Sequence, residues 1–288
     1  WMHVMAQVPI GRRENMTGWL FVNPAVGLLG LFMVYPILSS IWMSFQVGKG
    51  MNFRFGRFAN FYRLTQDPVF IHALLNKLTF FVVQVPIMIG LALLLAVTLN
   101  DSKLRGRSFF RTAIFLPCVT SLVAYSVLFK SMFAVDGVVN NFLDTLHIIS
   151  SPIPWLADPF WAKVVIILAI TWRWTGYNMI FYLAALQNID PSIYEAARID
   201  GVPAWARFTR ITLPALKPVI LFTTVTSTIG TLQLFDEVNN IPTLGGPADS
   251  TLTLSLYIYY LSFRFMPNFG YAATVSYVIV VLVMLLSF

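Results

Sequence analysis

Residues 78–99 read LTFFVVQVPIMIGLALLLAVTL and contain no charged side chain. The hydrocarbon core of a bilayer, about 30 Å thick, is crossed by roughly 20 apolar residues in an α-helix. This stretch is therefore long enough and apolar enough to span a membrane. Its proline, Pro86, is tolerated where neighbouring helices or polar side chains satisfy the carbonyl group that it frees, and this favours a helical bundle over a lone anchor.

The whole chain shares this character. Hydrophobic residues make up 58% of it and charged residues only 11%, whereas soluble domains contain about 25% charged residues. A water-soluble enzyme and a disordered chain are excluded, and a lone cysteine, Cys118, excludes a disulfide scaffold. The expected fold is an all-α integral membrane protein with six spans, at residues 19–45, 78–99, 111–133, 162–186, 218–235 and 271–288.

The charges predict how these spans are oriented. A net charge of +7 on so apolar a chain is typical of basic flanks beside membrane spans, not of nucleic-acid binding. Segments 1–18, 100–111 and 187–217 hold ten of the nineteen lysines and arginines, which places them on the inner side. Residues 1–18 would then be a cytoplasmic N-terminal segment, and 19–288 one transmembrane domain surrounded by lipid.

Two outer segments are also expected to be ordered. In segment 46–77, residues 69–76 are predicted to form an interfacial helix that leads into the second span. Segment 134–160 is rich in proline, and Trp155 and Trp161 are predicted to anchor it at the membrane interface.

The segment 187–217, here called the inner loop, carries signals for a short helix. Asp190 is a good N-cap, Pro191 suits the first helical position, and Gly201 suits the left-handed residue after the helix. Pro203 then predicts a second short helix that ends near Leu213-Pro214. On these signals alone, the segment is either an ordinary helical connection or a docking element.

The spacing inside the inner loop resembles the signature loop of permease subunits in binding-protein-dependent ABC importers. Glu195-Ala196-Ala197 is followed after three residues by Gly201, after nine more by Ile211, and then by Leu213-Pro214. Further motifs, Trp174–Asn178 and Gly245-Gly246-Pro247 among them, resemble the carbohydrate-importing, maltose-type branch of that family.

The resemblance implies a role for each motif residue and a set of partners. The inner loop would contain the coupling helix that docks on a cytoplasmic ATPase, with Glu195 making polar contacts, Ala196 and Ala197 packing closely and Gly201 permitting the turn. The partners would be a second, related permease in a heterodimer, two ATPase subunits, an extracytoplasmic solute-binding protein and a carbohydrate, and the assembly would lie in a bacterial inner membrane. ATP and magnesium would bind the ATPases, and this chain would be neither an enzyme nor a cofactor protein.

The fourth and fifth spans carry the candidate residues of a substrate pathway. Aromatic rings stack on the C–H faces of sugars while amides bind hydroxyl groups, and the candidates are Arg173, Trp174, Tyr177, Asn178, Gln233 and Asp236. Arginine inside a membrane nearly always faces a cavity or a partner, so Arg173 either contacts an anionic sugar derivative or pairs with a carboxylate of another subunit. The alternative for the aromatic residues is packing.

Two other classes of membrane protein can be compared with this interpretation. An ion-coupled secondary transporter would need acidic residues within its spans, and only Asp236 and Glu237 lie near the end of one. A membrane-embedded enzyme would need paired His, Asp or Glu side chains. The three histidines are scattered, which predicts no metal site, and no phosphate-binding glycine-rich loop is present.

Overall fold

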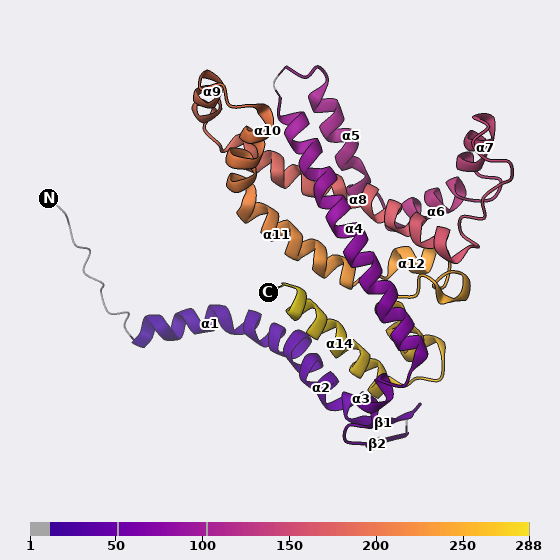
Figure 1. Cartoon of the computed structure of the whole chain (residues 1–288). Coiled ribbons are helices and arrows are strands. Elements are labelled where there is room, and N and C mark those ends of the chain that lie inside the picture. The colour runs from indigo at the N-terminus through magenta and orange to yellow at the C-terminus, as the bar shows by residue number, and fades with distance from the viewer. Residues whose placement is uncertain (1–11, 51, 102, 288) are drawn as a thin grey trace.

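The computed structural model describes residues 12–50, 52–101 and 103–287, and in these ranges it is helical apart from one short hairpin (Figure 1). The helices of the N-terminal half are α1 (Arg12–Leu29), α2 (Tyr35–Ser44), α3 (Ala59–Leu64), α4 (Pro68–Asn100), α5 (Arg107–Val119), α6 (Leu122–Met132) and α7 (Val138–Thr145). Those that follow are α8 (Pro159–Gln187), α9 (Pro191–Ile199), α10 (Ala204–Arg207), α11 (Leu213–Leu232), α12 (Asp236–Asn240), α13 (Leu254–Tyr259) and α14 (Phe269–Ser287).

Within the described ranges, five continuous helical stretches are long and apolar enough to cross a membrane, and a bent pair makes a sixth candidate. The five are Thr17–Ser44, Pro68–Asn100, Pro159–Gln187, Ala204–Asn240 and Phe269–Ser287. They confirm the all-α membrane fold. Of the predicted N-terminal segment, residues 1–11 lie outside the described residues, as does Phe288 at the end of the sixth predicted span, and residues 12–18 begin α1.

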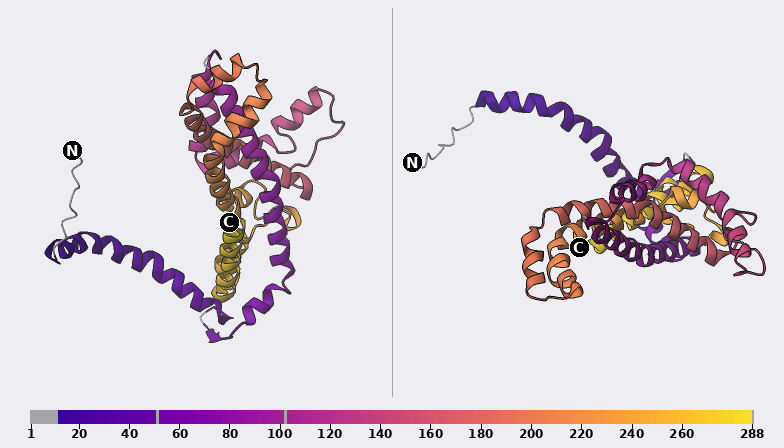
Figure 2. Two further views of the ribbon diagram at one scale, coloured as in Figure 1. Left: turned by 60° about the vertical axis from the view of Figure 1, so that its left-hand side comes forward. Right: turned by 90° about the horizontal axis from the view of Figure 1, so that it is seen from above.

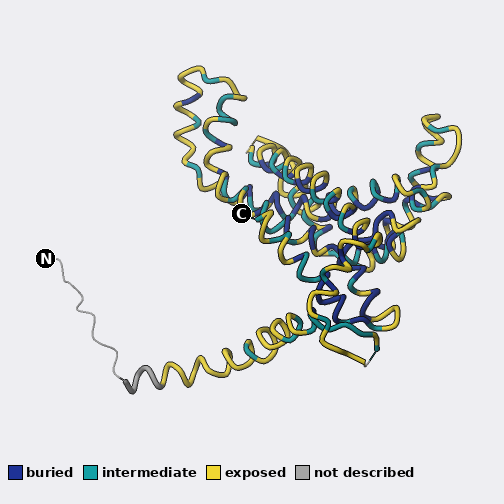
Figure 3. The backbone as a smooth tube through the Cα atoms, turned by 60° about the horizontal axis from the view of Figure 1, so that its bottom comes forward, coloured by how far each residue is buried: buried dark blue, intermediate teal, exposed yellow. Residues whose placement is uncertain are grey.

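The N-terminal part of the first span stands apart from the other helices, whereas α2 packs on α14. The span consists of α1 and α2, joined by a wide π-helical turn at Gly30–Val34, and its most apolar window has no buried residue. Figures 2 and 3 show it projecting from the bundle with an exposed surface along its length. In a membrane such a surface has to be covered by lipid or by another subunit.

The second span, α4, starts earlier than its apolar stretch. Asp67 caps it by accepting hydrogen bonds from the N–H groups of Val69 and Phe70, and Pro68 occupies the first helical turn. With 33 residues the helix is about 50 Å long and extends beyond the hydrocarbon core. Residues 69–76 are helical and lead into the second span as predicted, and they form the first turns of the same continuous helix.

Asp67 also fastens this end of α4 to the C-terminal part of the chain. The hydroxyl groups of Tyr257 and Tyr271 each donate to its second carboxylate oxygen at 2.6 Å. Burial opposes ionisation of Asp67, but the two hydroxyl and two backbone N–H donors outweigh it, so its pKa lies below the ordinary value. One carboxylate thus connects α4, α13 and α14.

The third predicted span, 111–133, is not one helix. The chain bends by 101° between α5 and α6, at Thr120 and Ser121, both of which have extended backbone. Pro117 lacks an N–H group, and the Thr120 hydroxyl donates to the Pro117 carbonyl at 2.7 Å. The freed carbonyl of Thr120 accepts a hydrogen bond from Arg173 at 3.2 Å. The expectation of a straight span is wrong because a tertiary contact satisfies the break.

The outer segments also differ from expectation. β1 (Gln46–Lys49) and β2 (Asn52–Phe55) form an antiparallel hairpin, which the sequence did not predict.

Trp155 is buried, and its indole N–H donates to Asn140 of α7 at 2.8 Å. The prediction that Trp155 is an interfacial anchor is wrong, since its polar atom is satisfied inside the protein. Trp161 is half-buried against it, with ring centroids 4.6 Å apart.

The inner loop forms α9 as predicted, but its second helix does not end at Leu213-Pro214. Asp190 caps α9 through the Ser192 N–H, and Gly201, at φ +68°, makes the left-handed turn. After α10 the chain passes through a π-helical turn, Phe208–Thr212, and continues into α11. The helix passes Pro214, which has no N–H group to donate, directly after this π-helical turn, so the end predicted there is wrong.

The helix α8 lies at the centre of the bundle, in contact with α4, α5 and α11 (Figures 1 and 3). Gly176 allows the backbones of α8 and α5 to meet, since a Cβ atom at this position would overlap the carbonyl oxygen of Ile114. Small residues such as Ala92, Ala96 and Ala169 are fully buried in the same core. Small side chains at close helix crossings are the usual means of packing in membranes.

We expect Gly176→Ala to destabilise the bundle. The added methyl group has to push α5 away from α8, and overpacking of this kind costs about 1–3 kcal/mol. The matched control is Gly90→Ala on α4, where a Cβ atom would meet nothing within 4 Å. Thermal unfolding of the purified protein in detergent should show a midpoint lowered by several degrees for Gly176→Ala and unchanged for Gly90→Ala. Equal midpoints for both variants would contradict the packing described here.

Candidate functional site: an internal pocket and the inner loop

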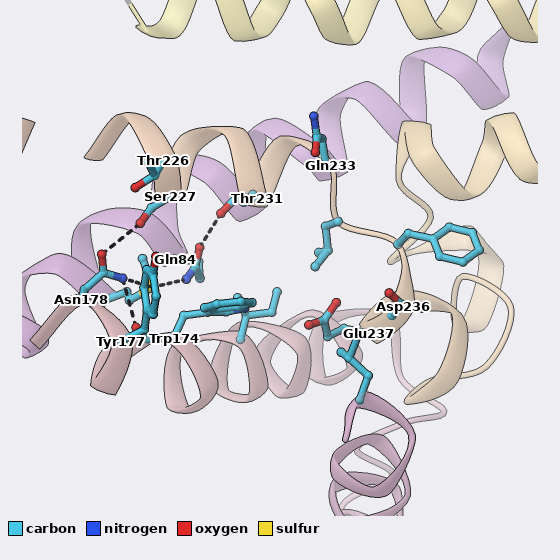
Figure 4. Close-up of a pocket in the computed structure, with 16 residues that line it drawn as sticks. Gln84, Trp174, Tyr177, Asn178, Thr226, Ser227, Thr231, Gln233, Asp236 and Glu237 are labelled. Carbon is cyan, nitrogen blue, oxygen red and sulfur yellow. Dashed lines mark hydrogen bonds between the residues drawn. The ribbon is translucent and has the colours of Figure 1, made fainter. Parts of the chain in front are cut away.

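A cavity of about 350 Å³, here called the internal pocket, lies between α4, α8, α11 and α12. Its wall is mostly apolar, with polar side chains from all four helices (Figure 4). Concave, largely apolar sites with a few convergent polar groups are typical of small-molecule binding. The lining residues are Gln84, Met88, Leu122, Ile170, Trp174, Tyr177, Asn178, Thr226, Ser227, Gly230, Thr231, Gln233, Leu234, Phe235, Asp236 and Glu237.

Two amides form the polar side of the pocket, and each is bonded to α11. Gln84 of α4 accepts a hydrogen bond from the Thr231 hydroxyl at 2.9 Å, and Asn178 of α8 accepts one from the Ser227 hydroxyl at 3.4 Å. Thr231 and Ser227 are four residues apart and so face the same way. Three helices thus fix the orientation of both amides, as a site for hydroxyl groups requires.

An aromatic wall stands beside these amides. The rings of Trp174 and Tyr177 on α8 meet edge to face, with centroids 5.7 Å apart, and Phe181 continues the row at 5.0 Å from Tyr177. Trp174 is partly exposed, and Tyr177 is half-buried. Flat apolar faces next to oriented amides can hold a sugar ring by its C–H face and its hydroxyl groups.

The other end of the pocket is acidic. α11 stops at Leu232, and α12 brings Asp236 and Glu237 to the lining, with Glu237 buried. The break between α11 and α12 is stabilised by Thr253, whose hydroxyl donates to the Leu234 carbonyl at 2.8 Å. These two carboxylates are the only charged side chains among the residues that line the internal pocket.

Arg173 does not line the pocket. It is only 6% exposed, donates to the Thr120 carbonyl at the bend between α5 and α6, and lies over the ring of Tyr125 with its Cζ atom 5.0 Å from the centroid. Among the described residues its Nε and Nη1 atoms have no hydrogen-bond partner. Its charge therefore lies behind the wall of the pocket, where it steadies the broken span.

The structure brings together five of the six residues predicted for the pathway, Trp174, Tyr177, Asn178, Gln233 and Asp236. Gln233 lies at the rim, with its side chain exposed and pointing away from Glu237 (Figure 4). The interpretation of the sequence left out Gln84, Ser227 and Thr231 as site residues. A lone glutamine in the uncharged stretch 78–99 was the signal that could have found Gln84, since amides inside a membrane need partners.

The inner loop lies at the same end of the bundle as the connection between α4 and α5, opposite the β1–β2 hairpin (Figure 1). Of the predicted docking residues, Glu195, Ala196, Gly201, Leu213 and Pro214 are exposed, Ile211 is half-buried and Ala197 is buried. Large apolar side chains are also uncovered here, with Ile199 86% exposed and Trp205 74% exposed. Such exposure beside polar residues marks an interaction surface.

The described residues contain no cluster of three or more His, Cys, Asp or Glu side chains placed to hold a metal ion. The internal pocket and the inner loop are the two candidate functional regions. Both are built on the same two long helices, since α8 lines the pocket and leads into the inner loop, and the inner loop leads into α11.

Comparison with known proteins identifies the family. The model of the binding-protein-dependent transport system inner membrane component matches residues 78–288. The chain is 66% identical over 288 residues to the lactose transport system permease protein LacF of Rhizobium radiobacter, covering 100% of this chain and 97% of the relative. It is 33% identical over 277 residues to the sulfoquinovosyl glycerol transport system permease protein SmoG of Agrobacterium fabrum, covering 94% and 88%.

A solved structure shares the fold. A chain of the bacterial alginate ABC transporter, crystallised in complex with alginate pentasaccharide-bound periplasmic protein, matches with a TM-score of 0.83 and 25% identity, over 96% of this chain and 92% of that one. Permease subunits of this kind are multi-pass inner-membrane proteins that are not enzymes and carry no cofactor of their own. The chain belongs to the inner membrane components of binding-protein-dependent transport systems, as a permease subunit of an ABC importer.

Proposed function

We propose that this chain pairs with a second, related permease to form the pathway of a sugar importer. Two ATPase subunits dock on the inner loop from the cytoplasm, and a periplasmic binding protein delivers the sugar from the other side. The observation that carries the proposal is the direct covalent connection between the internal pocket and the exposed inner loop through α8 and α11. The first span, whose most apolar window has no buried residue, offers further surface to a second subunit.

The orientation follows from the same arrangement. Lys103, Arg105 and Arg107 lie in and beside the connection between α4 and α5, at the end of the bundle that also carries the inner loop (Figure 1). Because basic residues collect on the cytoplasmic side, this end faces the cytoplasm. The hairpin end then faces the binding protein.

The coupling step uses the inner loop as a lever. Closure of the two ATPases around ATP moves Glu195, Ala196 and their exposed neighbours on α9. The movement passes into α8 and α11 and re-orients the pocket between the two sides of the membrane. Gly201 provides the turn after α9, and Ala197 is the buried residue of α9. Ile211, Leu213 and Pro214 lie where the inner loop enters the bundle.

The substrate is a sugar or oligosaccharide, and the pocket favours a neutral one. Trp174 and Tyr177 offer ring faces, and the amides of Asn178 and Gln84 bind hydroxyl groups, with Gln233 at the rim. The lining contains no lysine or arginine to pair with an anion, and the half-buried Asp236 repels one, while Arg173 is withdrawn behind the wall. A neutral disaccharide agrees with this lining and with the lactose permease among the relatives.

We expect Gly201→Asp to abolish uptake while the protein remains in the membrane. At φ +68° a side chain strains the turn, and the new carboxylate lies on the surface that meets the ATPase. Gly201→Asn is the matched control, because asparagine also adopts a positive φ and has nearly the size of aspartate but adds no charge to this surface. Uptake of labelled sugar by cells with equal amounts of each variant decides the matter, and normal uptake with Gly201→Asp would refute the docking role.

The charge selectivity is testable by Asp236→Asn, at the less buried of the two carboxyl groups in the lining. Removing a like charge about 8 Å from a ligand at an effective dielectric constant of about 20 recovers about 2 kcal/mol, so binding of an acidic sugar should improve at least about tenfold. Saturation-transfer NMR on the permease complex without its binding protein compares a neutral disaccharide with its aldonic acid. Asp249→Asn, an exposed carboxylate outside the pocket, is the control. An unchanged preference in Asp236→Asn would contradict the proposed repulsion of anions.

A further inference from the structure

The inner loop is a hairpin of two helices tied by two side chains. Near its base the Tyr194 hydroxyl of α9 bonds to the Thr212 hydroxyl at 2.9 Å. At its tip an Arg207 Nη1 atom donates to the Val202 carbonyl at 2.6 Å. The bond between Arg207 and Val202 stabilises the turn of the inner loop. The bond between Tyr194 and Thr212 joins α9 to the segment that leads directly into α11.

The hydrogen bond between Tyr194 and Thr212 lies at the edge of a cavity. A cavity of about 540 Å³ lies between α9, the end of α8 and the end of α4, and Tyr194 and Thr212 are both in its lining. The rest of its wall is mostly polar, with Asp101, Gln187 and Arg198 among its residues. Because α9 is not packed against the bundle on this side, a load on α9 can push it into the cavity instead of moving the bundle.

The packing of α9 itself does little to resist such a movement. Along its nine residues, all of which the structure describes, only Ala197 is buried. Tyr194 is half-buried, and the remaining side chains are exposed. The chain that joins α9 to α8 is the short segment 188–190, which can act as a pivot. The contact of Tyr194 with Thr212 is therefore the side-chain bond that fixes the angle of α9 to the bundle at its base.

Thr212 lies where a load on α9 would reach the membrane-spanning part. It is buried, it is the last residue of the π-helical turn Phe208–Thr212, and its hydroxyl is also 3.5 Å from the Arg207 carbonyl. The next residue begins α11, which carries Ser227 and Thr231 to the internal pocket. A force applied to Tyr194 through this bond is thus delivered to a pocket-lining helix.

We propose that the hydrogen bond between Tyr194 and Thr212 is a positioning contact that couples the ATPases to transport, a role that rests on the function proposed above. With the bond in place, α9 and α11 move as one body. Without it, closure of the ATPases swings α9 into the cavity, ATP is hydrolysed, and the pocket changes sides less often. Tyr194 and Thr212 would thus govern the amount of sugar moved per ATP and not the binding of either.

The test removes one hydroxyl group at a time from the complete transporter. Tyr194→Phe and Thr212→Val each delete the bond with little change of shape, and Thr212→Ser keeps it. The matched control is Thr209→Val, whose hydroxyl bonds only within its own helix, to the Trp205 carbonyl. Sugar imported per ATP hydrolysed is measured in proteoliposomes with the binding protein, alongside the yield of the assembled complex.

A net hydrogen bond shifts an equilibrium by about two- to tenfold, and we expect the sugar-to-ATP ratio of Tyr194→Phe and Thr212→Val to fall by that factor. The double variant should be no worse than either single one, because both remove the same bond. Thr212→Ser and Thr209→Val should keep the wild-type ratio.

The proposal is overturned if Tyr194→Phe and Thr212→Val keep the wild-type ratio, or if Thr209→Val loses as much. It is also overturned if the two deletions act additively. Should Tyr194→Phe fail to assemble, the contrast between Thr212→Val and Thr212→Ser gives the same decision. A normal ratio in these variants together with loss of transport in Gly201→Asp would reject only the coupling role of the Tyr194–Thr212 hydrogen bond. A chain that binds no ATPase would reject the proposed function itself.

Discussion

The close approach of α8 to α5 at Gly176 is the contact on which the other features depend. Without a side chain at Gly176, the two backbones meet, and α8 can lie between α4, α5 and α11. From that position it directs Trp174, Tyr177 and Asn178 into the internal pocket and Arg173 toward the bend between α5 and α6. The end of the same helix leads into the inner loop. One helix therefore places the pocket, supports the broken span and supplies one arm of the lever.

The polar groups inside this bundle show how such a site is tolerated in a membrane. An unsatisfied polar group in hydrocarbon costs several kcal/mol, and the amides of Gln84 and Asn178 meet hydroxyl groups of α11 instead of lipid. Arg173 satisfies the carbonyl that the bend leaves free. What remains facing the pocket is an aromatic wall, two oriented amides and two carboxyl groups.

The sequence predicted what is decided locally and missed what is decided by distant contacts. The helix α9 was predictable because Asp190, Pro191 and Gly201 act within a few residues of their own backbone, and the long spans because the bilayer sets their length. The bend at Thr120 depends on Arg173, 53 residues away, and the burial of Trp155 depends on Asn140. The continuation of α10 into α11 and the β1–β2 hairpin likewise gave no periodic signal. Five of the predicted pathway residues line the internal pocket, and they could be selected because polar and aromatic residues inside an apolar span stand out. Ser227 and Thr231, in contrast, resemble ordinary small helix residues.

We propose that this chain moves sugar only as part of an ATP-driven assembly that docks on its inner loop. Gentle affinity purification from native membranes, with mass spectrometry of the co-purifying chains, tests it most directly. The account predicts a second, related permease and an ATPase with a phosphate-binding glycine-rich loop in the same complex. A chain that purifies alone, and that transports sugar when reconstituted alone without ATP, would contradict the account and identify an ion-coupled secondary transporter.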